Sequence, residues 1–124
     1  MRVLVIGASL NEGRYSNMAV KMLRQFGHDV FAYGLKAGDI SDVSIDNVTK
    51  PYINLDTVTL YLNKTRQKEY YDYIISLNPN RVIFNPGTEN LEFYRLLDAA
   101  NIFHEEACTL VLLQTNQFEE SVLD

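Results

Sequence analysis

Apolar and polar residues alternate along the chain in blocks that predict strands separated by helices. Residues 3–6 (VLVI) form a continuous, β-branched run, which is typical of a strand buried on both faces. A small polar loop follows. Residues 15–26 then carry apolar side chains at helical spacing up to Gly27, a residue that suits a helix end. With a second strand predicted at residues 30–33, the chain opens with a strand–helix–strand unit.

The rest of the chain continues this alternation after a long polar connection from residue 36 to about residue 56. Loops of this length are uncommon in compact domains and are often functional. Within this connection, apolar and polar residues alternate weakly at 43–48, which predicts at most a short edge strand. Asn78-Pro79-Asn80 stops a later helix, because the residue before a proline avoids helical geometry. The further predicted elements are strands at 58–62, 81–84 and 102–103 and helices at 66–77 and 91–101.

Strands that alternate with helices form right-handed βαβ units and a parallel sheet covered on both faces. We therefore predict a single α/β domain over residues 1–124. It is a Rossmann-like, doubly wound, mostly parallel five-stranded sheet in the order 3-2-1-4-5, with helices on both faces. Strands 1 and 4 are then neighbours where the winding reverses, and ligands of such sheets bind outside the strand ends there. Loops 7–14 and 85–88 follow these two strands and form the candidate site.

Composition narrows the class of protein. The 124 residues are 47% hydrophobic, which is enough for a core, and the formal net charge is −5. Surfaces that bind nucleic acid are usually basic, so we expect no nucleic-acid partner. Cys108 is the only cysteine, which excludes an intrachain disulfide and a multi-cysteine metal site. The first residues are too short an apolar run for a secretion signal, and no run approaches the ~18 residues of a membrane helix. We therefore expect a cytoplasmic protein without a membrane partner.

The loop after the first strand is the strongest functional signal. A helix that begins there presents unpaired backbone N–H groups and the positive end of its dipole, which together bind anions. The loop fits neither common phosphate motif: Ser9 and Glu12 stand where a dinucleotide fingerprint has glycine, and Arg14-Tyr15 replace the Lys-Ser/Thr of a P-loop. Strand 2 also lacks the acidic residue that holds the ribose of NAD. Lys36 follows it instead, which favours an additional phosphate.

The alternative is a plain turn in which Gly7 serves only tight packing. Several anion-compatible side chains in the same loop argue against it. The expected ligand is therefore a small-molecule nucleotide or another phosphorylated cofactor. The side chains concerned are Ser9, Asn11, Arg14 and Ser16.

These residues resemble a known family. The run Gly7-Ala8-Ser9, with Asn11, Arg14, Tyr15-Ser16 and the helix after them, looks like the start of the coenzyme A-binding domain family. It is most similar to the stand-alone, single-domain members. The same Rossmann-like domain opens the α subunit of succinyl-CoA synthetase. The resemblance extends over nearly the whole chain at the level of its pattern of strands and helices.

The resemblance implies a cradle for coenzyme A. The loop after strand 1 holds phosphates through backbone amides around Ala8–Ser9 and through side chains, and Lys36 lies near the adenosine phosphate. The end of the third strand flanks the adenine or ribose, and the turn after the fourth lines the pantetheine side. The sequence departs from the family at both of these places, which leaves the exact ligand open. The implied binding residues are Gly7, Ala8, Ser9, Asn11, Arg14, Tyr15, Ser16, Lys36, Leu62, Asn63, Asn85, Pro86 and Gly87.

Catalytic groups are few. His104 precedes Cys108 by four residues, which allows a thiol–imidazole pair. The phosphorylated histidine of succinyl-CoA synthetase belongs to a second domain, however, and supports no role for His104 or His28. We expect His28 in a solvated turn, Cys108 as a small hydrophobe, and neither a catalytic residue nor a metal site. Tyr70 and Tyr71 cannot face the same way on a helix, so one is exposed or packs on a partner, which makes a homodimer an option.

Three hypotheses about function follow. The first is a non-enzymatic CoA or acyl-CoA binding protein that is regulatory or serves a partner protein. The second is a small NADP- or nucleotide-dependent enzyme. It needs a proton-transfer group at the switch point, where Asn85 is the nearest polar residue, and an amide does not act as an acid or base at pH 7. The third is an interaction module that has lost its ligand and keeps only the fold.

Overall fold

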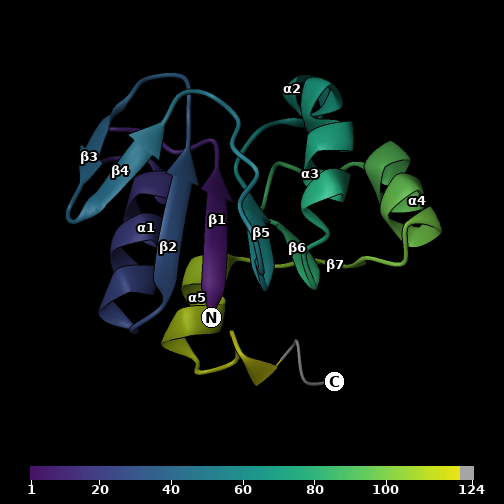
Figure 1. Ribbon diagram of the computed structural model, residues 1–124. Helices are drawn as coiled ribbons and strands as arrows, with labels where there is room; N and C mark the ends of the chain where they lie inside the picture. The colour runs from purple at the N-terminus through teal and green to yellow at the C-terminus, as the bar shows by residue number, and fades with distance from the viewer. Residues whose placement is uncertain (121–124) are drawn as a thin grey trace.

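Seven strands in residues 1–120, the part of the chain that the computed structural model describes, form one mixed sheet (Figure 1). Their order is β3-β4-β2-β1-β5-β6-β7. Strand β3 runs antiparallel to β4, and every other neighbouring pair is parallel. The strands are β1 (Arg2–Ile6), β2 (Asp29–Tyr33), β3 (Gly38–Ile40), β4 (Val43–Asp46), β5 (Thr57–Leu60), β6 (Arg81–Phe84) and β7 (Phe103–Glu106).

Helices cover both faces of this sheet, as predicted. Alternate residues of β1 point to opposite layers: Val3 and Val5 join the core under α1 and α5, whereas Leu4 and Ile6 join the core under α3 and α4. No helix in residues 1–120 is long and apolar enough to cross a membrane. The helices are α1 (Tyr15–Gln25), α2 (Lys64–Gln67), the 3-10 helix η1 (Lys68–Tyr70), α3 (Tyr71–Leu77), α4 (Leu91–Ala99) and α5 (Thr109–Gln114).

The predicted five-stranded order is wrong, because β4 occupies the place expected for the strand at 58–62. Strand β4 pairs with β2 in parallel, and β5 pairs with β1. The alternation at 43–48 is weak in the sequence, but Val43 and Ile45 are buried and β3 pairs beside them. With β4 counted as the third strand, the parallel strands run 3-2-1-4-5-6, and the winding reverses between β1 and β5. The segment after β5, rather than loop 85–88, therefore faces loop 7–14.

The predicted helix at 66–77 consists of α2, η1 and α3 in succession. The tighter 3-10 turn rotates the chain, so that Tyr70 and Tyr71 are both buried, with 8% and 9% of their surfaces exposed. The expectation that one of them faces outward is therefore wrong. A homodimer stays a prediction without this support.

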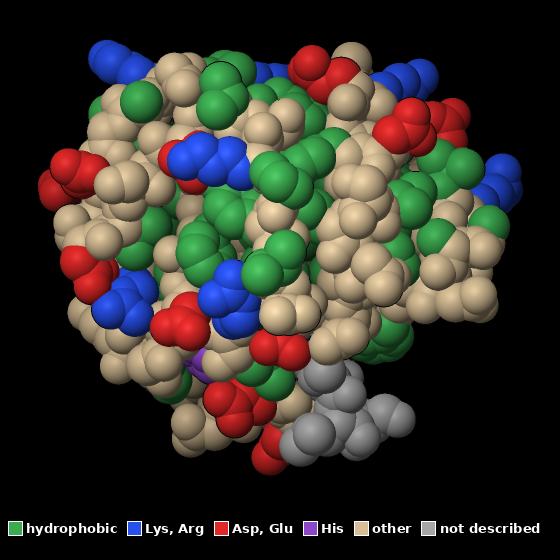
Figure 2. All heavy atoms as spheres, viewed as in Figure 1, with side chains coloured by type: hydrophobic (Ala, Val, Ile, Leu, Met, Phe, Trp, Pro, Cys, Tyr) green, Lys and Arg blue, Asp and Glu red, His purple; other side chains and the backbone are tan. Residues whose placement is uncertain are grey.

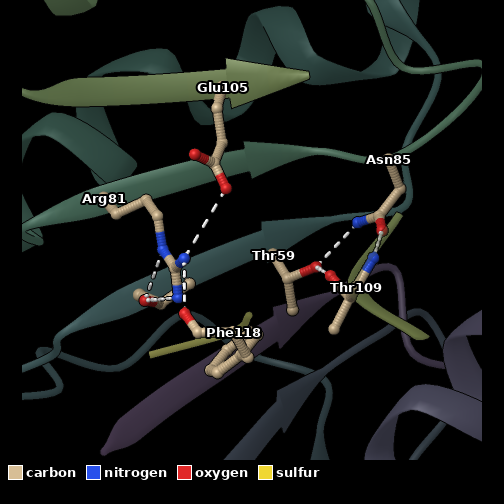
Figure 3. A network of polar contacts seen from close by, with 7 residues as sticks. Thr59, Arg81, Asn85, Glu105, Thr109 and Phe118 are labelled. Atoms are coloured by element: carbon tan, nitrogen blue, oxygen red, sulfur yellow. Dashed lines mark hydrogen bonds and ion pairs between the residues drawn. The ribbon is translucent and has the colours of Figure 1, made fainter. Parts of the chain in front are cut away.

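A buried arginine ties the chain together at the amino ends of the strands (Figure 3). Arg81 begins β6 and is fully buried; its Nε and Nη2 donate to Thr57 Oγ1 at 3.1 and 3.0 Å. Its Nη1 donates to the backbone oxygen of Phe118 at 2.8 Å and lies 3.6 Å from Glu105 Oε1. Burial lowers the pKa of Arg81 to about 10. These contacts hold the segment around Phe118 at the end of the sheet opposite loop 7–14.

The prediction of a solvated His28 is wrong as well. Its side chain packs against Phe118 with a ring-centroid distance of 5.1 Å, and the residue is only 3% exposed. Its Nδ1 lies 3.0 Å from the amino group of Met1. Burial lowers the pKa of His28, because removal from water disfavours the charged imidazolium. His28 therefore belongs to the structural core of the amino ends of the strands.

Candidate functional site

A cavity of about 640 Å³ opens where the carboxyl ends of β1, β2 and β5 meet. One wall is the loop after β1 together with the start of α1. A second wall follows β2, and a third is the segment between β5 and α3. This is the point at which the winding of the sheet reverses, the usual ligand position in such folds.

The loop after β1 is fixed against the end of β2 by contacts that require glycine. The N–H groups of Gly7 and Ala8 both donate to the backbone oxygen of Tyr33, at 2.9 and 3.0 Å. Gly7 has a φ of +95°, in the left-handed region that favours glycine. A Cβ on Gly34 would overlap the carbonyl oxygen of Ala8 and lie 3.1 Å from its carbonyl carbon. Both glycines therefore permit the close approach of the two segments.

Hydrogen bonds within the loop define its shape. The N–H of Asn11 donates to Ser9 Oγ at 3.1 Å, and Asn11 Oδ1 accepts from the N–H of Gly13 at 2.9 Å. The buried Asn17 donates from Nδ2 to the backbone oxygen of Ser9 at 2.9 Å. Two backbone amides, those of Ala8 and Ser9, are expected to bind phosphate. The Ala8 N–H donates to Tyr33, whereas the Ser9 N–H has no partner in residues 1–120. The loop is preformed without a ligand.

Helix α1 begins at the cavity with its positive end uncompensated. Arg14 is the N-cap residue; among residues 1–120 no side chain caps this helix, and its first turn contains no acidic residue. Arg14, Tyr15 and Ser16 all line the cavity. The free N–H groups of the first turn and the helix dipole therefore favour a bound anion at this wall.

Three cations and no carboxylate line the cavity. Arg14, Lys36 and Arg66 are exposed, and none of them forms an ion pair within the described residues. By contrast, Lys21 and Arg24 on α1 form salt bridges. Figure 2 shows Lys and Arg side chains, with acidic ones between them, along the upper edge of the molecule, toward which the arrows of β1, β2 and β4 point in Figure 1. In a protein of net charge −5, this local excess of unpaired positive charge favours an anionic ligand.

Most of the residues implied by the family resemblance do meet at this cavity. They come from the loop after β1, the start of α1 and single positions after β2, β5 and β6. The structure shows where they lie, and their contact with a ligand stays a prediction. Those that line the cavity are Gly7, Ala8, Ser9, Asn11, Arg14, Tyr15, Ser16, Lys36, Leu62 and Pro86.

Asn63, Asn85 and Gly87 do not line the cavity, and local structure explains each case. Asn63 caps α2, since its Oδ1 accepts from the N–H of Arg66 at 3.0 Å. Gly87 donates its N–H to the carboxylate of Glu89. These three residues therefore lie outside the lining of the cavity, and their contact with a ligand stays a prediction.

Asn85 is a structural residue, as Figure 3 shows. It is 2% exposed, and its Nδ2 donates to Thr59 Oγ1 at 2.7 Å and to the backbone oxygen of Leu60 at 2.9 Å. Its Oδ1 accepts from the N–H of Thr109 at 2.9 Å. Both polar atoms of this amide are hydrogen-bonded, so Asn85 links β5, β6 and the start of α5.

The sequence prediction misses a group of lining residues that come mainly from the end of β2 and the segment after β5. The residues after β5 are missed because the predicted strand order is wrong: this segment faces loop 7–14 only when β5 lies beside β1. For the residues at the end of β2, Gly34 directly after the second predicted strand is a sequence signal, because a glycine there permits a close approach to the neighbouring loop. The missed residues are Leu10, Tyr33, Gly34, Leu35, Tyr61, Arg66 and Tyr70.

The histidine and cysteine near the C-terminus do not join the cavity. His104 Nε2 lies 2.7 Å from Asp98 Oδ1, and its ring stacks on Tyr94 with centroids 4.8 Å apart. Cys108 is partly exposed at the N-cap of α5. Neither residue is among those that line the cavity at the switch point.

Comparisons with known proteins agree with this geometry. A crystal structure of an uncharacterized protein is 40% identical with a TM-score of 0.92, covering 94% of this chain and 97% of that one. Cell-free ID.343 from Thermus thermophilus (17% identity, TM-score 0.80, covering 94% of this chain and 90% of that one) shares the fold. So does a conserved hypothetical protein from Pyrococcus furiosus (20% identity, TM-score 0.79, covering 89% and 97%). No curated protein matches. The family model of a CoA binding domain matches residues 1–114, and the chain therefore belongs to the CoA binding domain family.

Proposed function

We propose that this protein binds coenzyme A or an acyl-CoA and does not transform it. The observation that carries the proposal is the cavity at the switch point. There the start of α1 meets three cations, and among residues 1–120 these cations have no ion-pair partner and no carboxylate lines the cavity. Membership of the CoA binding domain family supports this choice of ligand.

The polar groups of the cavity suit the phosphates of CoA. We place the diphosphate at the start of α1, where Ser9, Arg14 and Ser16 supply backbone, guanidinium and hydroxyl donors. We place the ribose phosphate near Lys36, which follows β2. The free ribose diol of NAD is usually held by a carboxylate at this position, and none of the lining residues carries one. The cavity therefore suits a nucleotide with an additional phosphate.

The apolar part of the lining suits the pantetheine arm. Pro86 is the one residue of the turn after β6 that lines the cavity. Leu62 also lines it, on the segment that follows the neighbouring β5. We therefore assign the arm to Leu62 and Pro86, and no longer to Asn85 and Gly87.

The titratable groups of the lining favour binding over catalysis. Within the described residues, no His, Cys, Asp or Glu lines the cavity. Burial raises the pKa values of Tyr61 and Tyr70, so these phenols stay protonated at neutral pH. A general base must have a pKa near the working pH, and these lining groups do not meet that requirement.

Calorimetric titration with CoA, dephospho-CoA, NADP and NAD tests the proposal. We expect CoA to bind more tightly than dephospho-CoA, and NAD to bind most weakly. No heat of binding with millimolar CoA would refute CoA binding, and a clear preference for NADP would favour the enzyme hypothesis. CoA should also raise the melting temperature of the wild type and of Arg95→Ala, but not of Arg14→Ala. Arg95 is the matched control because it is exposed on α4 and does not line the cavity.

A further inference from the structure

A pair of buried hydroxyl groups lies at the cavity between β2 and η1. Tyr33 and Tyr70 are each 8% exposed, both line the cavity, and their hydroxyl oxygens are 2.8 Å apart. The rings meet edge to face with centroids 5.4 Å apart. Tyr33 ends β2 and Tyr70 ends η1, so two elements distant in the sequence hold the pair in place.

This pair leaves one hydrogen-bond donor unused. When one hydroxyl donates to the other, the accepting hydroxyl keeps its own hydrogen. Neither oxygen has another hydrogen-bond partner within residues 1–120. Burial and the contact with Tyr33 raise the pKa of Tyr70 to about 12, so the hydroxyl remains a donor at neutral pH. Because both tyrosines line the cavity, this hydroxyl can donate to a ligand oxygen there.

Arg66 is a cation at the same wall of the cavity as this hydroxyl donor. Arg66 lies in α2 and Tyr70 ends η1, which directly follows α2, and both residues line the cavity. Burial, the contact with Tyr33 and the nearby carboxylate of Glu69 raise the pKa of Tyr70, and the positive charge of Arg66 opposes this rise. Of these two charged residues, only Arg66 lines the cavity. Guanidinium presents a planar fork of donors that matches a carboxylate or a phosphate. A cation and a protonated hydroxyl at one wall are the donors that an anionic oxygen requires.

We propose that Arg66 and the Tyr33–Tyr70 pair form a second anion subsite, separate from the one at Arg14. Arg14 precedes α1 on one face of the sheet, whereas Tyr70 packs in the core under α3 and α4 on the other face. The inference rests on the proposed function and adds that the ligand carries an anionic oxygen apart from its diphosphate. In CoA ligands such an oxygen belongs either to a carboxylate on the acyl group or, if Arg66 rather than Lys36 holds it, to the ribose phosphate.

Calorimetry with two matched pairs of ligands tests the second subsite and distinguishes these sources. CoA and dephospho-CoA differ in the ribose phosphate; succinyl-CoA and butyryl-CoA differ in a terminal carboxylate. Arg66→Gln should weaken binding of the charged member of one pair about tenfold and of its uncharged match less than about threefold. Tyr70→Phe keeps the ring and should show the same preference with a smaller change. Arg95→Gln is the control and should bind all four ligands like the wild type.

Two results overturn the inference. Equal weakening of both members in each pair would show a general electrostatic effect without a subsite, and unchanged affinities would show that Arg66 does not contact the ligand. Either result leaves CoA binding itself intact. If the wild type binds none of the four ligands, the proposed function fails and the second subsite fails with it. Circular dichroism and melting curves of each variant confirm that the fold is present when affinities are compared.

Discussion

Substitution of Gly34 by alanine tests whether the close approach of β2 to the glycine loop shapes the site. The added Cβ would overlap the carbonyl oxygen of Ala8 and lie 3.1 Å from its carbonyl carbon, whereas relaxed carbon contacts are about 3.5–4.0 Å. The loop must move, and the hydrogen bonds from Gly7 and Ala8 to Tyr33 are the contacts at risk. At about 1 kcal/mol for each of the two bonds and 1–3 kcal/mol for steric strain, the free energy of unfolding should fall by about 3–5 kcal/mol.

Urea denaturation followed by circular dichroism measures this change, and titration with CoA measures its effect on the site. We expect Gly34→Ala to lower both stability and CoA affinity. Gly13→Ala is the matched control, because its Cβ would meet only the side-chain oxygen of Asn11 at 3.3 Å, and its stability should stay within about 1 kcal/mol of the wild type. If Gly34→Ala unfolds at the same urea concentration as the wild type and binds CoA equally well, the steric argument is wrong.

Three further changes test other parts of the molecule. Arg81→Ala removes a fully buried cation 3.6 Å from Glu105 and should lower the unfolding free energy by about 3–5 kcal/mol in urea; Arg81→Met, which refills the space, should lower it less. Because the pKa of His28 is lowered in the fold, the unfolded chain takes up a proton first as the pH falls through 6.5. Stability should therefore decline from pH 7.5 to 5.5, and an equal decline in His28→Asn would contradict this cause. Asn85→Ala leaves buried partners unpaired and should cost about 1–3 kcal/mol. In the folded fraction its CoA affinity should stay within about threefold of the wild type, unlike that of Arg14→Ala, and a large selective loss would return Asn85 to the site.

Local patterns in the sequence predict most elements of the fold. The run at 3–6 and the helical spacing at 15–26 correspond to β1 and α1, since apolar periodicity and a terminal glycine act over neighbouring residues. The segment at 43–48 is different. Its apolar–polar alternation is short and weak. It forms a strand because it pairs in parallel with β2 on one side and antiparallel with β3 on the other. Strand order depends on such pairings between distant residues, and for this reason the predicted order is wrong.

The same distinction applies to the candidate site. The glycine loop and Arg14 are recognisable from the sequence, because a strand, a turn and a helix start are adjacent in the chain. Arg66 is an ordinary basic residue in a helix until β5 is placed beside β1, which brings it to the cavity. Asn85 shows the opposite case: the sequence places it at a strand end, and the fold buries it among hydrogen-bond partners.

The sequence by itself determined the α/β class, the family and the loop that forms one wall of the cavity, because each follows from residues that are neighbours in the chain. Only the tertiary structure decided that the segment after β5 lies across the cavity from this loop. Strand pairing brings the Tyr33–Tyr70 hydroxyl pair together across a separation of 37 residues, and no local periodicity encodes that contact. The loop after β1 therefore predicts a phosphate site, and the folded sheet supplies the other half of the cavity.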